Sequence, residues 1–501
     1  MTLNRPIFFL WITLLSALIY GQVGVSVIPV NRNASAQNSL RILSLGELQF
    51  SDPALFNLYD QGGSPMGLLE NHSERINLSA GLLNSDRASS GDSLVIKQHQ
   101  FFIPQFGFYQ PGVFGAVLYF QKENETYDHK NGDTAETSRT SFGIDLAAGP
   151  ASGLFRIGFG VHAMLGTTDY PGDPERFILE VPSLRLDLGS KIIKGVEVGI
   201  FTGLSAHFDS LNSPQDKRER LAVMTLPRYG LLADVGGLDQ SPVIGNVKLE
   251  LGTHRFFGEY RPVNQGGLEY PTIWNDYFEF KTQWLYPFHV QDFLLQPSIK
   301  FSHRSEDAQG YRGITGNQNP LKKGDLIQNM AWTTSTTNFG VGANALYHDY
   351  LNLILEWETS GKNLKVDSSS DQQYTRFAIG TEVKLDQIEY LKIPKTISLA
   401  LRMGWTSNQE PKNLPGYRDY HFTTFIPSQD IPTQKAVGVP KLDTPVAYSA
   451  FHIGFGAGIL NDKLELNGIL SFPSQLEVFT QSRSQDVSGT ELGVNLTAKV
   501  F

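Results

Sequence analysis

Residues 491–501 read Glu-Leu-Gly-Val-Asn-Leu-Thr-Ala-Lys-Val-Phe and are the last residues of the sequence. Apolar side chains occupy every second position, at Leu492, Val494, Leu496, Ala498 and Val500. A glutamate, a glycine, an asparagine, a threonine and a lysine stand between them. A period of two places the apolar residues on one face of a β-strand and the polar residues on the other. This stretch therefore predicts a strand with one apolar and one wetted face.

The first residues predict export. Arg5 precedes a nearly uninterrupted apolar run at 7–19, which at about 13 residues is too short to cross a bilayer but suits a secretory signal. We predict a signal peptide at residues 1–21, cleaved after Gly21. A second cleavage site, after Ala36, and an uncleaved anchor helix are the alternatives.

The composition excludes several classes of protein. No later run of 18 apolar residues exists, so helical membrane spans are not predicted. A mean hydropathy of −0.20 would suit a soluble protein, but a β-barrel with a polar lumen has a similar average. The chain has no cysteine, which excludes disulfides and thiol chemistry. A net charge of −9 without basic clusters argues against nucleic-acid binding.

Alternating segments like the last one recur from residue 74 onward. One face of residues 397–405 is apolar throughout, and Phe102, Phe106 and Phe108 are predicted to share a face farther upstream. The segments run for about 10 to 14 residues, which is longer than soluble strands and long enough to cross a membrane at a tilt. A soluble β-sandwich also alternates, but its strands are shorter.

The connections between these segments alternate between short and long. Short turns are predicted near 111–112, 149–150, 190, 287, 348–349, 387 and 461–462, and longer polar loops at 123–138, 362–372, 408–445 and 474–489 among others. Short inner turns and long outer loops are typical of outer-membrane barrels. We predict an all-β fold, a transmembrane antiparallel β-barrel of about 14–18 strands over residues 74–501. Pro182 and Pro227 interrupt two segments and predict bulges or breaks there.

Residues 22–73 do not alternate and are predicted to form a small N-terminal plug or periplasmic segment that enters the barrel lumen. Within it, Asp52-Pro-Ala-Leu55 and Ser64-Pro-Met-Gly-Leu68 resemble the N-terminal motif of FadL-like outer-membrane proteins, the family of long-chain fatty-acid transporters. The resemblance implies a monomeric barrel of fourteen strands, plugged by its N-terminus, that passes hydrophobic molecules. A related branch of that family serves protein secretion without a hydrophobic substrate.

Two functions follow as hypotheses. The first is a transporter or channel in the cell outer membrane for hydrophobic or other small molecules. The second is a non-catalytic structural or secretion-associated barrel without a small-molecule substrate. The expected partners are outer-membrane lipid, a possible hydrophobic ligand, and the barrel assembly machinery, which would contact the C-terminal strand ending in Phe501. No cofactor and no nucleic-acid partner are expected.

Charged residues on the polar faces are the candidate lumen-facing residues. They are Arg156, Glu197, Lys248, Glu250, Glu279, Lys281, Lys300, Glu356, Glu382 and Arg402. Mixed charges of this kind either line a channel or pair across strands, and we favour pairing.

An enzyme is the weaker alternative. His162, His207 and His254 lie near strand ends, and Ser205 shares a face with His207. A spacing of two residues separates that pair by about 6.6 Å, which is loose for a nucleophile and its base. No metal-binding motif is present, so catalysis is not predicted.

Overall fold

The computed structural model covers residues 1–501 and describes most of the chain from residue 40 onward. The described residues are 40–51, 65–69, 76–89, 94–110, 112–130, 134–150, 152–169, 175–193, 196–212, 218–225, 228–235, 245–262, 271–312, 326–365, 369–411, 445–480 and 483–500. The predicted signal peptide, Ala36, the 52–55 half of the motif and Phe501 lie outside them.

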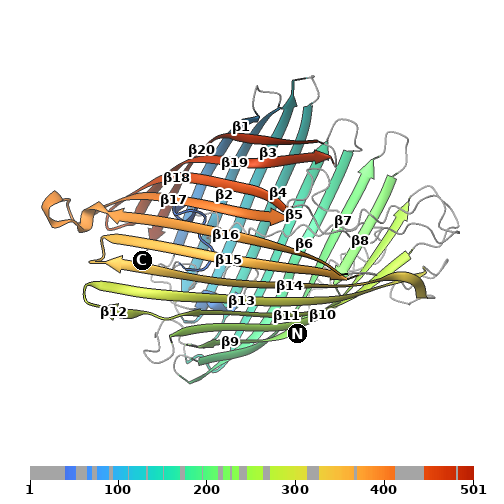
Figure 1. The fold of residues 1–501 in the computed structure, drawn as a ribbon. Coiled ribbons are helices and arrows are strands. Elements are labelled where there is room, and N and C mark those ends of the chain that lie inside the picture. Colours follow the sequence, from blue (N-terminus) through green and yellow to red (C-terminus); the bar gives the residue numbers. More distant parts are fainter. Residues whose placement is uncertain are drawn as a thin grey trace, which may run out of the picture.

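One antiparallel sheet closes on itself to form a barrel (Figure 1). Its strands are β1 (Ile76–Ser89), β2 (Leu94–Gln110), β3 (Phe114–His129), β4 (Thr134–Ala148), β5 (Arg156–Asp169), β6 (Glu175–Ile193), β7 (Val196–Asn212), β8 (Arg218–Thr225), β9 (Arg228–Val235), β10 (Asn246–Pro262), β11 (Pro271–Leu285), β12 (Phe288–Val290), β13 (Phe293–Arg312), β14 (Leu326–Tyr347), β15 (Leu351–Lys365), β16 (Ser369–Lys384), β17 (Ile397–Pro411), β18 (Pro445–Ile459), β19 (Leu464–Thr480) and β20 (Arg483–Val500).

The barrel has eighteen strands, which confirms the predicted fold class and lies within the predicted range. The barrel has fewer strands than the twenty segments named above, because two positions in the sheet are each occupied by two segments. β8 and β9 share one position between β7 and β10, and β12 continues β11 alongside β13. β8 ends at Thr225 and β9 begins at Arg228. Pro227, where a bulge or break is predicted, lies outside the described residues.

Closure joins the last strand to the first. β20 pairs with β1 in antiparallel register from Ile76 opposite Val500 to Ser89 opposite Val487. Leu82 lies opposite Val494, so the apolar face of the last strand continues that of the first. This pairing leaves no free edge along either strand, so the C-terminal stretch closes the barrel.

Bulges move some residues to the other face. The registers of β2 with its neighbours shift around Pro104, so Phe102 is buried inside the barrel while Phe106 and Phe108 are exposed outside. The prediction that these three share a face is therefore wrong, because an extra residue in one strand reverses the alternation. Pro182 lies in a similar shift between β6 and β7, as predicted.

Strand ends also differ from the prediction at several long loops. β15 continues to Lys365 and β16 begins at Ser369, which replaces most of the loop predicted at 362–372. The loops predicted at 123–138 and 474–489 are likewise mostly strand. A hairpin can extend into water beyond the membrane because its ladder still satisfies the backbone groups, whatever the polarity of its side chains.

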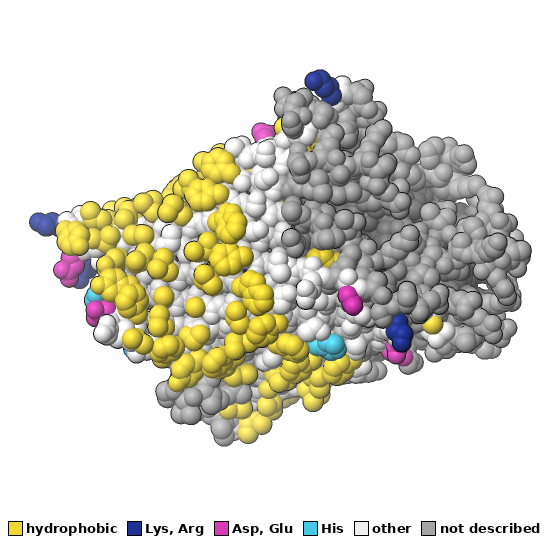
Figure 2. All heavy atoms as spheres, viewed as in Figure 1, with side chains coloured by type: hydrophobic (Ala, Val, Ile, Leu, Met, Phe, Trp, Pro, Cys, Tyr) yellow, Lys and Arg dark blue, Asp and Glu magenta, His cyan; other side chains and the backbone are white. Residues whose placement is uncertain are grey.

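The outer wall of the barrel is apolar. Exposed Leu, Ile, Phe and Trp side chains cover it, and Figure 2 shows them gathered over the part of the barrel nearer the short turns. Where side chains are described, the adjacent positions on the strands point inward and are buried or polar, as in β1 and β16. An apolar outer band around a polar interior is the pattern of a barrel that crosses a bilayer. No helix in the described ranges is long and apolar enough to cross a membrane.

Residues 40–51 and 65–69 lie inside the barrel (Figure 1). Residues 40–51, which we call the lumen segment, begin with the short helix α2 (Leu40–Ser44) and contact β17 to β20. The 3₁₀ helix η2 (Pro65–Leu69) packs against β2 to β6. Two further 3₁₀ helices, η5 (Leu385–Gln387) and η6 (Glu389–Leu391), form the turn between β16 and β17.

A charge on the outer wall should destabilise the barrel according to its depth. Ile379 is exposed on β16 with apolar neighbours Leu355 and Trp405 in register. We expect Ile379→Lys to lower the free energy of unfolding in lipid vesicles by about 2–4 kcal/mol, because an ammonium group must enter hydrocarbon. Gln373→Lys, on the same face of β16 near its long-loop end, is the control and should cost about 0–1 kcal/mol. Equal losses would show that this face does not contact lipid.

Candidate functional site

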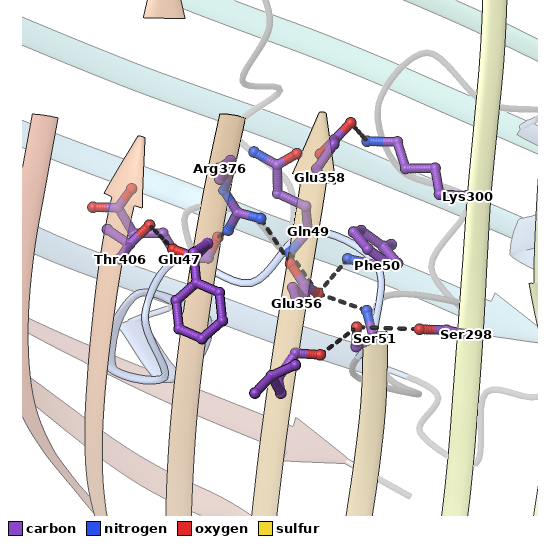
Figure 3. Close-up of polar contacts among 12 residues, drawn as sticks. Glu47, Gln49, Phe50, Ser51, Ser298, Lys300, Glu356, Glu358, Arg376 and Thr406 are labelled. Carbon is purple, nitrogen blue, oxygen red and sulfur yellow. Dashed lines mark hydrogen bonds and ion pairs between the residues drawn. The ribbon is translucent and has the colours of Figure 1, made fainter. Parts of the chain in front are cut away.

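A buried carboxylate on β15 holds the end of the lumen segment. Glu356 accepts hydrogen bonds from three consecutive backbone N–H groups, those of Gln49, Phe50 and Ser51, at 2.6–3.1 Å (Figure 3). Arg376 on β16 donates to the same carboxylate at 2.8 Å and also to the carbonyl oxygen of Glu47. The charge is therefore neutralised within the barrel wall while the segment supplies most of its hydrogen bonds.

A second buried carboxylate holds the start of the segment. Glu382 on β16 accepts two hydrogen bonds from the Arg41 guanidinium, at 3.1 and 2.9 Å, and one from Arg402 on β17, at 2.7 Å. Arg402 also donates to Asn467 on β19 at 2.8 Å. One acid thus joins a residue of α2 to the wall, and the fork of Arg41 fixes its orientation.

The lumen segment lies directly on the backbone of the wall. Gly46 follows α2 with φ of +89°, a left-handed conformation that reverses the chain. A side chain on Gly46 would meet the carbonyl oxygens of Ile379 and Trp405 at 2.8 Å, and one on Gly404 would overlap the backbone of Leu45 and Gly46. Because Gly46 in the segment and Gly404 in β17 both lack side chains, the two backbones can approach each other closely.

Apolar contacts also hold residues 40–48 and 68–69 against the inner wall. Three clusters of buried side chains join them to the inner wall. They are Ile42, Leu45 and Leu48 with Ile354 and Ala378; Leu40 with Leu83, Phe102 and Ile469; and Leu68 and Leu69 with Tyr109, Val117, Tyr119 and Ala147. The first two lie under the lumen segment and the third under η2, on β2–β4. The N-terminal residues are thus attached to two parts of the wall.

The predicted lumen-facing charges lie on the inner wall mostly in ion pairs. Arg156 pairs with Glu197 at 2.6 Å, and Glu250 with Arg185 at 3.1 Å. The other pairs are Lys281 with Glu279, Lys300 with Glu358, Glu356 with Arg376, and Glu382 with Arg402. Lys248 lies half-buried on β10, opposite Asp234 and Gln283 in register.

Several residues of the site were not predicted. Arg41 and Glu47 lie in a segment without periodicity, so no pattern pointed to them. Arg376 shares the inward face of β16 with Glu382, a signal that was present in the alternation. Arg304 continues the polar face of Lys300 on β13, which is a further signal present in the alternation.

One cluster contains the serine, histidine and acid of a nucleophilic triad, but its serine is not accessible to a substrate. His452 Nδ1 lies 2.8 Å from Ser471 Oγ, and His452 Nε2 lies 3.6 Å from a Glu47 carboxylate oxygen. Tyr448 donates a hydrogen bond to the same carboxylate oxygen. Ser471 and His452 are both buried, which leaves no room for a substrate at the hydroxyl group.

The histidines singled out in the sequence form no triad within the described side chains. His162 lies 3.1 Å from Asp145 and stacks on Tyr119. Neither of these two neighbours is a serine. The side chains of Ser205, His207 and His254 lie outside the described part of the chain. In the described ranges no group of three or more His, Asp or Glu side chains could hold a metal ion.

An apolar hollow of about 510 Å³ lies between β6 and β11. Leu186, Ile200, Leu231 and Phe278 line it, and all four are exposed on the outer wall. None of the described N-terminal residues, 40–51 and 65–69, belongs to its lining. The hollow therefore faces lipid and is separate from the lumen segment.

No family model and no curated protein matches the chain. Among solved structures it is similar to the ferric citrate transporter FecA in the unliganded form, with 8% identity, coverage of 86% of this chain and 79% of that chain, and a TM-score of 0.41. It is also similar to Pseudomonas aeruginosa OccK2 (OpdF) in complex with glucuronate, with 10% identity, 86% and 99% coverage and a TM-score of 0.35. A third similar structure is Pseudomonas aeruginosa OpdK with vanillate, with 12% identity, coverage of 84% of this chain and 98% of that chain, and a TM-score of 0.32. At these identities and TM-scores, the substrates of those proteins cannot be assigned to this chain. The architecture described above is taken from the strand pairing of this chain alone.

Proposed function

We propose that this chain is a barrel of the cell outer membrane that passes small molecules through its lumen. The observation that carries the proposal is a charged inner wall that remains partly accessible beside the lumen segment, as at Lys281 and Lys300. Polar groups that line a protein lumen are typical of aqueous conduction routes. The apolar outer wall, the predicted export signal and the closed sheet support placement in the outer membrane.

The inner wall favours polar solutes over hydrophobic ones. The apolar hollow does not adjoin the lumen segment, and the apolar clusters there are filled by the segment's own side chains. The FadL-like resemblance implies fourteen strands, whereas this barrel has eighteen, so transport of fatty acids has no support from the architecture. A fatty-acid-binding assay on the purified protein would test that finer assignment.

A structural or secretion-associated barrel is the second candidate. The buried ion pairs at Glu356 and Glu382 favour it, because they hold the lumen segment across part of the interior. Under this alternative the segment would seal the barrel permanently. Recognition of the C-terminal strand by the barrel assembly machinery is compatible with both candidates and is proposed for both.

Reconstitution separates the two candidates. We expect the purified, heat-modifiable protein to produce stepwise conductance in planar bilayers and to swell liposomes in small sugars, with a size limit set by the lumen segment. Protein-free vesicles and a heat-unfolded sample are the controls. A folded barrel that neither conducts nor swells liposomes would favour the structural alternative.

A further inference from the structure

Three cations lie near one another on the inner wall. Lys281 lies on β11, and Lys300 and Arg304 lie on β13; we call these three residues the basic wall. Lys281 is opposite Ser302 in register, midway between the other two. Diagonal neighbours in an antiparallel pair are about 7–8 Å apart, so the three side chains can reach one small ligand together.

Each cation of the basic wall is more exposed than the acid that pairs with it. The exposed side-chain fractions are 46% for Lys281 against 18% for Glu279, 28% for Lys300 against 12% for Glu358, and 38% for Arg304 against 17% for Glu306. The cation is thus the more accessible member of each pair to a solute in the lumen. The longer lysine and arginine side chains reach past the shorter acids toward water.

Other parts of the inner wall are arranged differently. Arg185 is almost completely buried, at 3% exposed, while its partner Glu250 is 18% exposed. Arg376 and Arg402 are buried under the lumen segment beside their acids. The basic wall therefore presents accessible positive charge where these other arginines do not.

The basic wall begins where the described lumen segment ends. The Lys300 ammonium lies 5.7 Å from the centre of the Phe50 ring (Figure 3). Gln283 on β11 donates a hydrogen bond to the Phe50 carbonyl oxygen at 3.0 Å. From Lys300, β13 runs toward Arg304 and the long-loop end of the barrel. A solute entering from that end would meet the basic wall before it reached the lumen segment.

We propose that the basic wall is a binding site for small organic anions with one or more carboxylates, an inference that rests on the proposed passage of solutes. Ammonium and guanidinium groups form strong, charge-assisted hydrogen bonds with carboxylates. Low-dielectric walls concentrate the field of such groups within the lumen. The acids paired with these cations keep binding weak, which suits a site that must release its solute to allow passage.

The test compares succinate with butane-1,4-diamine, probes of equal length and opposite charge, on the folded full-length protein. Equilibrium dialysis measures binding, and the reversal potential in a potassium chloride gradient measures ion selectivity. We expect binding of succinate but not of the diamine, and selectivity for anions. The triple variant Lys281→Gln, Lys300→Gln, Arg304→Gln should bind succinate roughly five- to tenfold more weakly. Lys395→Gln, in an exposed turn at the short-turn end, is the control and should bind normally.

A second pair of variants separates the basic wall from a general effect of charge loss. Replacing Glu279 and Glu306 with glutamine should tighten succinate binding, because the two cations beside them lose their internal partners. Binding of succinate without conductance would overturn the proposed passage and support the site. Conductance with no preference for anions, or succinate binding unchanged in the triple variant, would overturn the site alone.

Discussion

Glu356→Ala is expected to release the lumen segment from the inner wall. The change removes the acceptor of the Gln49, Phe50 and Ser51 N–H groups and leaves Arg376 buried without its acid. Breaking a buried ion pair on one side costs about 3–5 kcal/mol, because the remaining charge is uncompensated. We expect the wall to avoid this cost by admitting water, which requires that the segment leave.

Amide hydrogen exchange at residues 49–51 measures that release directly, and single-channel conductance measures its effect on the lumen. Both should rise in Glu356→Ala. Glu358→Ala is a matched control for hydrogen exchange on the same face of β15, because Glu358 pairs with the partly exposed Lys300 and bonds no described residue of the segment. Unchanged exchange in Glu356→Ala would show that the apolar clusters alone hold the segment.

Gly404→Val is expected to displace the same segment by steric overlap rather than by loss of charge. Even the first carbon of a side chain at position 404 would overlap the backbone of Leu45 and Gly46. Packed interiors cannot absorb such an overlap, and neither backbone can rotate away as a side chain could. The barrel strand itself should persist, since Gly404 pairs with Gly380 and His452 through its backbone.

The control is Gly361→Val on β15, where an added side-chain carbon meets no atom within 4 Å. We expect the conductance and hydrogen exchange of Gly404→Val to match those of Glu356→Ala, with heat-modifiability retained. Combining the two changes should add little, because both remove the same contact and their effects are not independent. A fully additive double variant would mean that the two positions act on different structures.

The barrel was predictable because its signal is repeated and local. Each strand alternates apolar and polar residues, and the last stretch, 491–501, shows this as clearly as any. Strand ends were less predictable, as at 362–372, because hydrogen bonding extends a hairpin into water without an apolar pattern. Phe102 was placed on the wrong face because a bulge at Pro104 reverses the alternation.

The candidate site was only partly predictable. The alternation of apolar and polar positions places Glu356, Glu382 and Arg402 on the polar face of their strands. It does not identify the residues with which they form ion pairs. Arg41 and Glu382 meet across 341 positions of sequence. One signal in the sequence marks this contact: apolar residues such as Leu83 and Ile354 interrupt the polar face where residues 40–48 pack.

By itself the sequence determined that this chain is a closed β-barrel with an apolar outer wall, because a period of two is a property of each strand alone. It also determined which charges face inward. Only the tertiary structure decided which inward charges hold the lumen segment, which glycines let it approach, and where cations such as Lys281 stay exposed. Those features depend on closure, which brings β1 to β20 and places residues 40–51 against strands hundreds of positions away.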